Sequence, residues 1–227
     1  LLGLHHYKGC LWKEVDLKRY VEEKHQVNTI VMNDVELALL GECTEGEGKI
    51  SDNILFIKYG EGFAARAIID GNLLKGNNMA AGEIGYYLES IDKLTDEFVC
   101  PGRLEQDLCK ESVSREEYDG YSGIEYLQRQ SSAGVSGARQ KLDGVIDRIS
   151  VIIANMVLVL NPEIVILGGI ASKFDLESIH RMETIVQKTC PFVPKIMRSG
   201  LGIDAPVIGG VKIALEDAEK QLVTYWK

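Results

Sequence analysis

The apolar residues of the chain recur with two different periods, and both predict regular structure. Between positions 139 and 160 they recur every three or four residues, which is the spacing of one face of an α-helix. This face comprises Leu142, Val145, Ile146, Ile149, Ile152, Ile153, Met156, Val157 and Leu160. We therefore expect one long helix with a wide buried face. Asn161-Pro162 ends it, because proline cannot continue a helix.

Weaker patterns predict further helices on both sides of this one. Asp16 precedes a helix that runs to about Lys24, and Asp175 precedes another, since aspartate is a preferred N-cap. A third helix follows Asn33-Asp34, and the last covers about 207–222. Residues 44–52 form a polar loop in this prediction, and 90–130 form one or two amphipathic helices joined by a loop.

Short apolar runs predict strands at 28–32, 54–57, 65–69, 163–167 and 195–197. The second and third runs are joined by Gly60-Glu61-Gly62 and followed by Asp70-Gly71, a favoured hairpin dipeptide, so we expect them to pair antiparallel. Strands that alternate with helices around an antiparallel pair are typical of one α/β unit with a mixed sheet.

Composition narrows the class of protein. The 227 residues carry a formal net charge of −9, which argues against a broad basic surface that grips nucleic acid. Five cysteines at irregular spacings suit a reducing compartment better than a disulfide framework, and no apolar run reaches the roughly 20 residues that span a bilayer. We expect a soluble, cytoplasmic protein. Because the sequence opens on Leu1 and resembles mid-domain sequence, we also expect a fragment or the product of a shortened gene.

Two acidic positions are candidates for chemistry. Asn33-Asp34 lies between a predicted strand and a predicted helix, so either residue could cap the helix. Alternatively, Asp34 is a carboxylate at the carboxyl end of a strand, where α/β proteins bind ligands, and it could act as a general base. Glu83 lies among small residues in AAGEIG and is either a solvent-exposed loop residue or a ligand carboxylate.

Two glycine-containing turns are candidates for a nucleotide site. A turn such as Gly60-Glu61-Gly62 lets a phosphate approach the backbone, but the Glu61 carboxylate would repel it. Gly168-Gly169 is either a nucleotide-contacting turn or a strand-to-helix turn with positive φ. Cys100 and Cys109 do not form a Cys-x-x-Cys pair, so we expect no metal site.

Taken in order, four segments resemble the ROK family, which comprises sugar-responsive transcriptional repressors and sugar kinases. The segments are VMNDVELALLGE, ILFIKYGEGFAARAIIDGNLLKGNNMAAGEIGYY, NPEIVILGGIAS and LGIDAPVIGGVKIAL. The resemblance implies an α/β, actin-like ATPase (ribonuclease H-like) fold with a mixed sheet flanked by helices. It implies that residues 1–32 connect from a small lobe and that 33–227 form the large lobe. The Asp-x-Gly phosphate loop and the DNA-binding module of the family would lie outside this chain.

The resemblance also assigns roles to residues. Asn33 and Asp34 match the ligands of sugar hydroxyls, and Asp34 matches the catalytic base of the kinases. Glu83 and Glu105 match sugar-contacting glutamates, and Tyr86 stands where the family has a histidine that serves sugar and zinc. Gly60, Gly62, Gly168 and Gly169 match nucleotide-binding positions.

The chain departs from the family at the phosphate and zinc positions. Glu61 replaces a threonine, Ala64-Ala65-Arg66 replaces glycines, and Arg103 replaces a zinc cysteine. These changes predict a degenerate nucleotide site, no zinc and no other cofactor, although Arg66 could offer a phosphate a compensating positive charge.

We therefore expect the sugar-sensing, oligomerising and non-catalytic part of a ROK-type transcriptional regulator. Its predicted partners are a small sugar or sugar derivative, further copies of itself, and DNA through a module outside this chain. One alternative is a divergent sugar kinase that uses ATP and Mg²⁺, with Asp34 as base. The other is a pseudoenzyme that serves only oligomer assembly.

Overall fold

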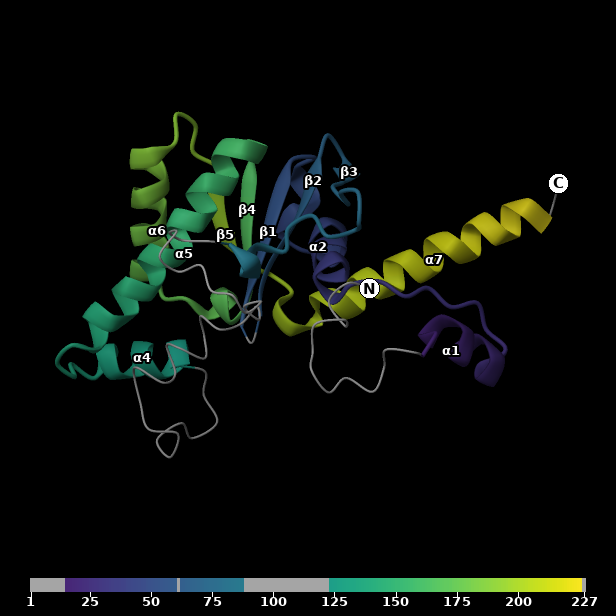
Figure 1. The fold of residues 1–227 in the computed structure, drawn as a ribbon, viewed down its shortest axis with the longest axis horizontal. Helices are drawn as coiled ribbons and strands as arrows, with labels where there is room; N and C mark the ends of the chain where they lie inside the picture. The colour runs from purple at the N-terminus through teal and green to yellow at the C-terminus, as the bar shows by residue number, and fades with distance from the viewer. Residues whose placement is uncertain (1–14, 61, 88–122, 226–227) are drawn as a thin grey trace, which may run out of the picture.

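A five-stranded mixed sheet forms the centre of the computed structural model, which describes residues 15–60, 62–87 and 123–225 (Figure 1). The strand order is β3-β2-β1-β4-β5, and β1 pairs antiparallel with β2 and parallel with β4. The strands are β1 Ile54–Tyr59, β2 Phe63–Ile69, β3 Asn72–Leu73, β4 Ile164–Gly169 and β5 Lys195–Arg198. The predicted mixed sheet and the predicted antiparallel pair are confirmed.

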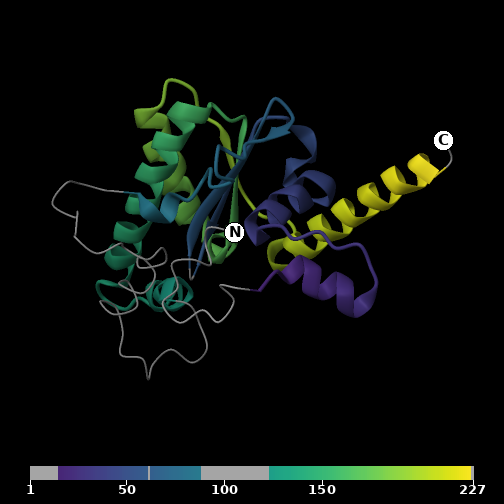
Figure 2. The same cartoon turned by 45° about the vertical axis from the view of Figure 1, so that its right-hand side comes forward.

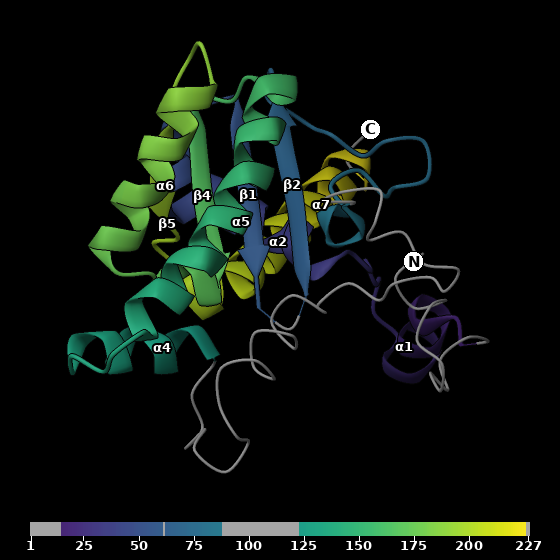
Figure 3. The ribbon, with the colours of Figure 1, turned by 60° about the vertical axis from the view of Figure 1, so that its left-hand side comes forward.

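Helices cover both faces of this sheet (Figure 3). The helices of the described residues are α1 Leu17–His25, α2 Asp34–Glu45, α4 Gly123–Ser132, α5 Ala138–Leu160, α6 Leu176–Thr189 and α7 Ala205–Tyr225, of which α1 lies apart from the sheet. Short 3₁₀ turns are η2 Glu47–Ile50, η3 Ile84–Tyr86, η6 Ile170–Lys173 and η7 Gly202–Asp204. On β1, Leu55 and Ile57 face the core under α4, α5 and α6, whereas Ile54 and Phe56 face the core under α2. Because both faces are covered, the strand is apolar at successive positions.

The predicted helix ends are confirmed where side chains or proline define them. Asp16 caps α1 by accepting a hydrogen bond from the Arg19 amide at 3.1 Å, and Asp175 caps α6 through the Ser178 amide at 2.7 Å. Helix α5 begins one residue before the predicted start and ends at Asn161, which adopts a left-handed φ of 46°.

Two predictions of local structure are wrong. Residues 28–32 form no strand, because an extended run needs a ladder partner and no described strand lies beside this one. Val27 and Ile30 are instead 53% and 46% exposed. The predicted loop at 44–52 is partly helical, since α2 continues to Glu45 and η2 follows it. Of the helices predicted in 90–130, α4 is seen and 90–122 lie outside the described residues.

Helix α7 packs across α2 with its first half and projects away from the sheet with its second half (Figures 1 and 2). Glycines make the crossing close, because a Cβ on Gly41 would lie 2.1 Å from the Ala205 carbonyl oxygen and a Cβ on Gly209 would lie 1.9 Å from that of Leu37. Farther along α7, the Asp217 carboxylate accepts a hydrogen bond from the side-chain Nδ2 of Asn28 at 2.6 Å. Among the helices of the described ranges, none is both long enough and apolar enough to span a membrane.

Candidate functional site

The amino end of α2 brings Asn33 and Asp34 to the carboxyl end of β1. Asn33 is the N-cap, and its Oδ1 accepts a hydrogen bond from the Val35 amide at 2.9 Å. Asp34 begins the helix with its side chain 60% exposed, and its Oδ2 forms an ion pair with the Lys58 Nζ of β1. Asn33 therefore fulfils the capping alternative, while the Asp34 carboxylate lies beside β1 rather than at the end of the strand predicted at 28–32, which is absent; a ligand role for Asp34 stays a prediction.

The loop after β3 folds back onto β2 and carries Glu83. The Ala65 amide donates to the Gly82 carbonyl at 2.7 Å, which fixes the loop against the strand. Gly82 has a φ of +89°, and a Cβ there would lie 2.1 Å from the Ala65 carbonyl oxygen. Only glycine allows this approach. The loop therefore delivers Glu83 to a fixed place beside β2.

Arg66 of β2 is the partner of Glu83. Its side chain is only 2% exposed, and its Nη2 donates to Glu83 Oε1 at 2.8 Å. Its Nη1 donates to the carbonyl oxygens of Ala65 at 2.7 Å and Ala81 at 3.0 Å. Its Nε lies 4.0 Å from Oε1 of Glu36, a buried residue of α2, and finds no hydrogen-bond partner among the described residues. The Arg66 guanidinium, which the sequence analysis considered as a partner for a phosphate, therefore forms its hydrogen bonds inside the protein.

The sheet register places the two acid–cation pairs on one face. Lys58 is opposite Ala64, and Phe56 is opposite Arg66, so Lys58 and Arg66 are diagonal neighbours on adjacent strands. Such neighbours lie about 7–8 Å apart. Asp34 and Glu83 are far apart in the sequence, but each binds one of these two cations. Two of the residues that the sequence analysis assigned to the sugar are therefore each paired with a cation on the same face of the sheet.

The remaining residues of that assignment are placed less completely. Tyr86 is half-buried in η3, and its amide donates to the Glu83 carbonyl at 3.3 Å, so it shares the turn that holds Glu83. Glu105, together with Cys100, Arg103 and Cys109, lies outside the described residues. Within 15–60, 62–87 and 123–225, no group of three His, Cys, Asp or Glu residues is arranged to hold a metal ion.

The two glycine turns differ in what they require of glycine. Gly60 donates its amide to the Gly62 carbonyl at 2.9 Å, and a Cβ on Gly62 would meet nothing within 4 Å; Glu61 lies outside the described residues. At the other turn, a Cβ on Gly168 would lie 2.2 Å from the Phe56 ring, and Gly169 has a φ of +64°. Gly168 and Gly169 are therefore required by packing against β1 and by the turn into η6. A nucleotide contact at either turn stays a prediction.

An open pocket of about 560 Å³ lies where η6 meets α4. It is lined by Glu125, Gln128, Arg129, Ser132, Ala133 and Lys173. Lys173, the last residue of η6, forms an ion pair with Glu125 of α4 at 2.7 Å. Lys173 is the one residue of η6 in this lining, which includes neither Gly168 nor Gly169.

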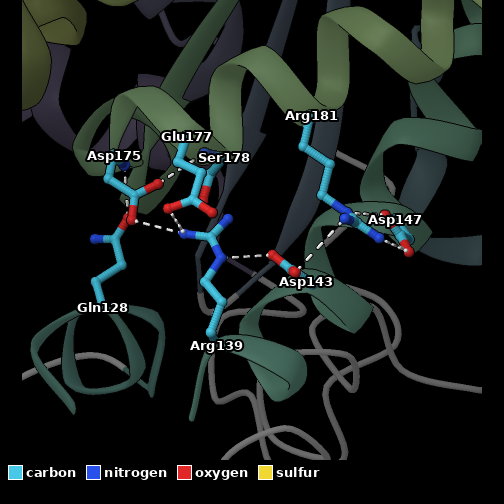
Figure 4. Close-up of polar contacts among 8 residues, drawn as sticks. All are labelled: Gln128, Arg139, Asp143, Asp147, Asp175, Glu177, Ser178 and Arg181. Carbon is cyan, nitrogen blue, oxygen red and sulfur yellow. Dashed lines mark hydrogen bonds and ion pairs between the residues drawn. The ribbon is translucent and has the colours of Figure 1, made fainter. Parts of the chain in front are cut away.

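A separate polar cluster joins α5 to α6 (Figure 4). Arg139 forms ion pairs with Asp143 at 2.7 Å, Asp175 at 3.2 Å and Glu177 at 3.1 Å. Arg181 binds both carboxylate oxygens of Asp147, and this hydrogen bonding raises the pKa of Arg181 above its ordinary value. Acidic and basic side chains alternate across α5 and α6, so we infer that this cluster holds the two helices together.

Sequence reasoning missed the buried acids of α2. Glu42 is fully buried and accepts hydrogen bonds from the Glu47 amide at 2.9 Å and the Leu201 amide at 3.1 Å, as well as from the Ser199 hydroxyl. It ties α2 to the turn before α7. The burial of Glu42 could have been predicted from its position. Glu42 follows Val35, Ala38 and Leu39 on the apolar stripe of the predicted helix, and a carboxylate buried there needs hydrogen-bond donors.

Comparison with known proteins agrees with this architecture. A glucokinase from Halalkalibacterium halodurans is 29% identical over 232 residues, covering 91% of this chain and 69% of the glucokinase. A xylose repressor from Caldicellulosiruptor bescii is 26% identical over 230 residues, covering 91% of this chain and 57% of the repressor. The chain thus spans little more than half the length of some curated relatives and about two thirds of others.

The solved structure of a ROK hexokinase from Thermus thermophilus superimposes with a TM-score of 0.71 at 20% identity, covering 85% of this chain and 68% of the hexokinase. At this identity the likeness concerns the fold alone: a mixed sheet flanked by helices, as in the actin-like ATPase fold of ROK sugar kinases. The family model described as "ROK family" matches residues 2–217. With this match over nearly its whole length, the chain belongs to the ROK family.

Proposed function

We propose that this chain is the sugar-sensing part of a ROK-type transcriptional regulator and that it binds a sugar without phosphorylating it. The family contains both regulators and kinases, and the xylose repressor and the glucokinase match the chain over equal shares. Similarity alone therefore does not choose between the two roles. The choice rests on the geometry of the site.

The observation that carries the proposal is the ion pair between Asp34 and Lys58. A kinase would use Asp34 as its base, and a base must accept a hydrogen bond from the hydroxyl whose proton it removes. Here the Lys58 ammonium, which can only donate, lies at that carboxylate instead. The pair holds the carboxylate in one place, which suits recognition of a sugar, and at Oδ2 the ammonium takes the position that a reacting hydroxyl would need.

The phosphate side supports the same proposal. Phosphoryl transfer depends on groups that position the phosphates and stabilise their charge. In this chain Glu61 adds a negative charge between Gly60 and Gly62, and the Arg66 guanidinium is directed to Glu83 rather than to solvent. The proposal therefore includes no cofactor.

The sugar side retains what recognition needs. Asp34 is paired through Oδ2 and Glu83 through Oε1, and the two side chains are 60% and 34% exposed. A carboxylate can accept hydrogen bonds at both oxygens, which suits the neighbouring hydroxyls of a sugar ring. In our proposal, Asn33, Tyr86 and Glu105 complete the site.

Sensing would work through a shift between two conformations. Closure over the sugar would favour one conformation, and a DNA-binding module outside this chain would respond to it. We further propose that the protein acts as a homo-oligomer in the cytoplasm.

Calorimetric titration of glucose, xylose and N-acetylglucosamine tests the site. We expect Asp34→Asn and Glu83→Gln each to weaken the binding of the preferred sugar by about ten-fold or more, because a hydrogen bond to a charged group contributes roughly 1.5–3 kcal/mol.

Glu45→Gln is the matched control, because Glu45 lies on the same helix, is 59% exposed and pairs with Lys49 at 2.6 Å. It should leave affinity unchanged. Unchanged binding in both Asp34→Asn and Glu83→Gln would refute the site.

The alternative is a sugar kinase with Asp34 as base and ATP and Mg²⁺ as cosubstrates. One observation favours it: the glucokinase match over 91% of the chain. ATP-dependent phosphorylation of any sugar in the panel that disappears in Asp34→Asn would replace our proposal with this one. Oligomers that bind none of the sugars would favour the assembly-only pseudoenzyme.

A further inference from the structure

We propose that Arg66 is a positioning residue that orients Glu83 and links its loop to α2, so that both carboxylates of the sugar site are held in register. This inference rests on the proposed sugar site. It concerns a position at which the chain departs from the glycine that the family pattern led us to expect.

Burial and hydrogen bonding define what Arg66 does. The side chain is 2% exposed, yet three of its hydrogen bonds go to the loop and to β2: one to Glu83 Oε1, one to the Ala81 carbonyl and one to the Ala65 carbonyl. The planar guanidinium offers donors in a fixed geometry, so these contacts set the direction of the Glu83 carboxylate as well as its distance.

Stability alone does not account for such a residue. Removing charges from water is unfavourable, and apolar replacements of buried ion pairs are often neutral or stabilising. An apolar side chain on β2 could fill this space next to α2 without desolvating a guanidinium. What it could not do is direct a carboxylate that is 34% exposed. The buried charge is therefore better explained by orientation of Glu83.

Arg66 also contacts the helix that carries Asp34. Glu36 follows Asp34 by two residues in the first turn of α2, and it is 5% exposed. The Arg66 Nε is buried without a hydrogen-bond partner in the described part of the chain and lies 4.0 Å from Glu36 Oε1. This distance is about 1 Å longer than a hydrogen bond. A small approach of α2 to β2 would satisfy this donor, so the arginine couples the Asp34 helix to the Glu83 loop.

Hydrogen exchange of the sugar-free protein tests whether Arg66 holds the Glu83 loop against β2. Arg66→Met alone would leave Glu36 buried beside an apolar residue and could unfold the chain, so the informative comparison is Glu36→Gln/Arg66→Met against Glu36→Gln. The reporters are the amides of Ala65 and Ile84, which donate to Gly82 at 2.7 and 2.8 Å. We expect both to exchange about ten-fold faster or more in the double variant, while amides of β4 keep their protection. Equal exchange at the reporters in the two variants would overturn the proposal.

Sugar titrations supply a readout that a purely structural residue would not change. With glucose and its monodeoxy analogues, Glu83→Gln should lose the preference for the hydroxyl that Glu83 binds. Glu36→Gln/Arg66→Met should lose the same preference, with affinity lower by about ten-fold, and Arg66→Lys should retain part of it.

Adding Glu83→Gln to the Glu36→Gln/Arg66→Met variant should cause no further loss, because both changes remove one interaction. Additive losses, or full wild-type affinity in Glu36→Gln/Arg66→Met, would overturn the role of Arg66. If wild-type protein bound none of glucose, xylose and N-acetylglucosamine, the proposed function would fail, and the exchange experiment would still decide the role of Arg66.

Discussion

Two carboxylates at the edge of the sheet are each matched by a cation from a strand. Lys58 pairs with the exposed Asp34, and Arg66 pairs with the half-buried Glu83. Surface pairs such as the first contribute little to stability. In this protein the two ion pairs fix the position of the Asp34 carboxylate at the amino end of α2 and that of the Glu83 carboxylate in the loop after β3.

Sequence reasoning found the acids of this site and missed their partners. Asp34 and Glu83 could be recognised from local context, since one follows an apolar run that was predicted as a strand and the other lies among small residues. Lys58 and Arg66 become their neighbours only through the register of β1 and β2 and the return of the loop to β2. These are tertiary features that no local pattern encodes. Glu105 and the turn residue Glu61 lie outside the described residues, so their predictions stay predictions.

Cys43 provides a pH-dependent test at the residue scale. Burial, with a further contribution from the neighbouring Glu42 carboxylate, raises the pKa of this thiol from 9.0 to about 11. Below pH 9 the thiol is protonated in both the folded and the unfolded chain, so its contribution to stability is fully present. As pH rises toward 11 the unfolded chain ionises first, and this contribution is lost.

We therefore expect the free energy of unfolding to fall more steeply between pH 9 and 11 in wild-type protein than in Cys43→Ala. Urea unfolding at several pH values measures this difference. Parallel pH profiles for the two proteins would contradict the predicted ionisation of Cys43.

At the scale of elements, the periodicity of apolar residues predicted those helices and strands that are positioned by burial of their apolar side chains. Helix α5, β1 and β2 agree with the predictions within a few residues because their apolar positions face a core on one or both sides. The predicted strand at 28–32 is wrong because its apolar composition was the only signal, and hydrogen bonding to a neighbouring strand decides whether such a segment is extended. The close crossing of α2 and α7 was not predicted either, because a glycine inside a sequence segment normally argues against a helix there.

Neighbouring glycines of α7 test that crossing with a built-in control. A Cβ at Gly209 would lie 1.9 Å from the Leu37 carbonyl oxygen, whereas a Cβ at Gly210 meets nothing within 4 Å. We expect Gly209→Ala to destabilise the protein by about 1–3 kcal/mol, because the helices must separate. Gly210→Ala should be neutral or stabilise it by up to about 1 kcal/mol. Thermal or urea unfolding of both variants measures the difference, and equal stabilities would rule out the close crossing.

At the scale of the whole molecule, the sheet separates two sets of helices. One face carries α5 and α6, which the ion pairs of Arg139 and Arg181 join. The other face carries α2, whose amino end holds Asn33 and Asp34, and α7, which extends beyond the sheet (Figure 2). The family assignment followed from motif order along the whole chain and is confirmed, whereas our proposal of a regulator rather than a kinase rests on the Asp34–Lys58 pair, which local sequence does not encode.

The central claim is that the chain binds a sugar and does not phosphorylate it. One NMR sample containing the protein, Mg²⁺-ATP and glucose, xylose or N-acetylglucosamine tests both parts. Saturation transfer from protein to sugar protons reports binding, and phosphorus resonances report any sugar phosphate. We predict saturation transfer to at least one sugar, with the ATP resonances unchanged over hours. A growing sugar phosphate signal in wild-type protein, absent in Asp34→Asn, would contradict the account.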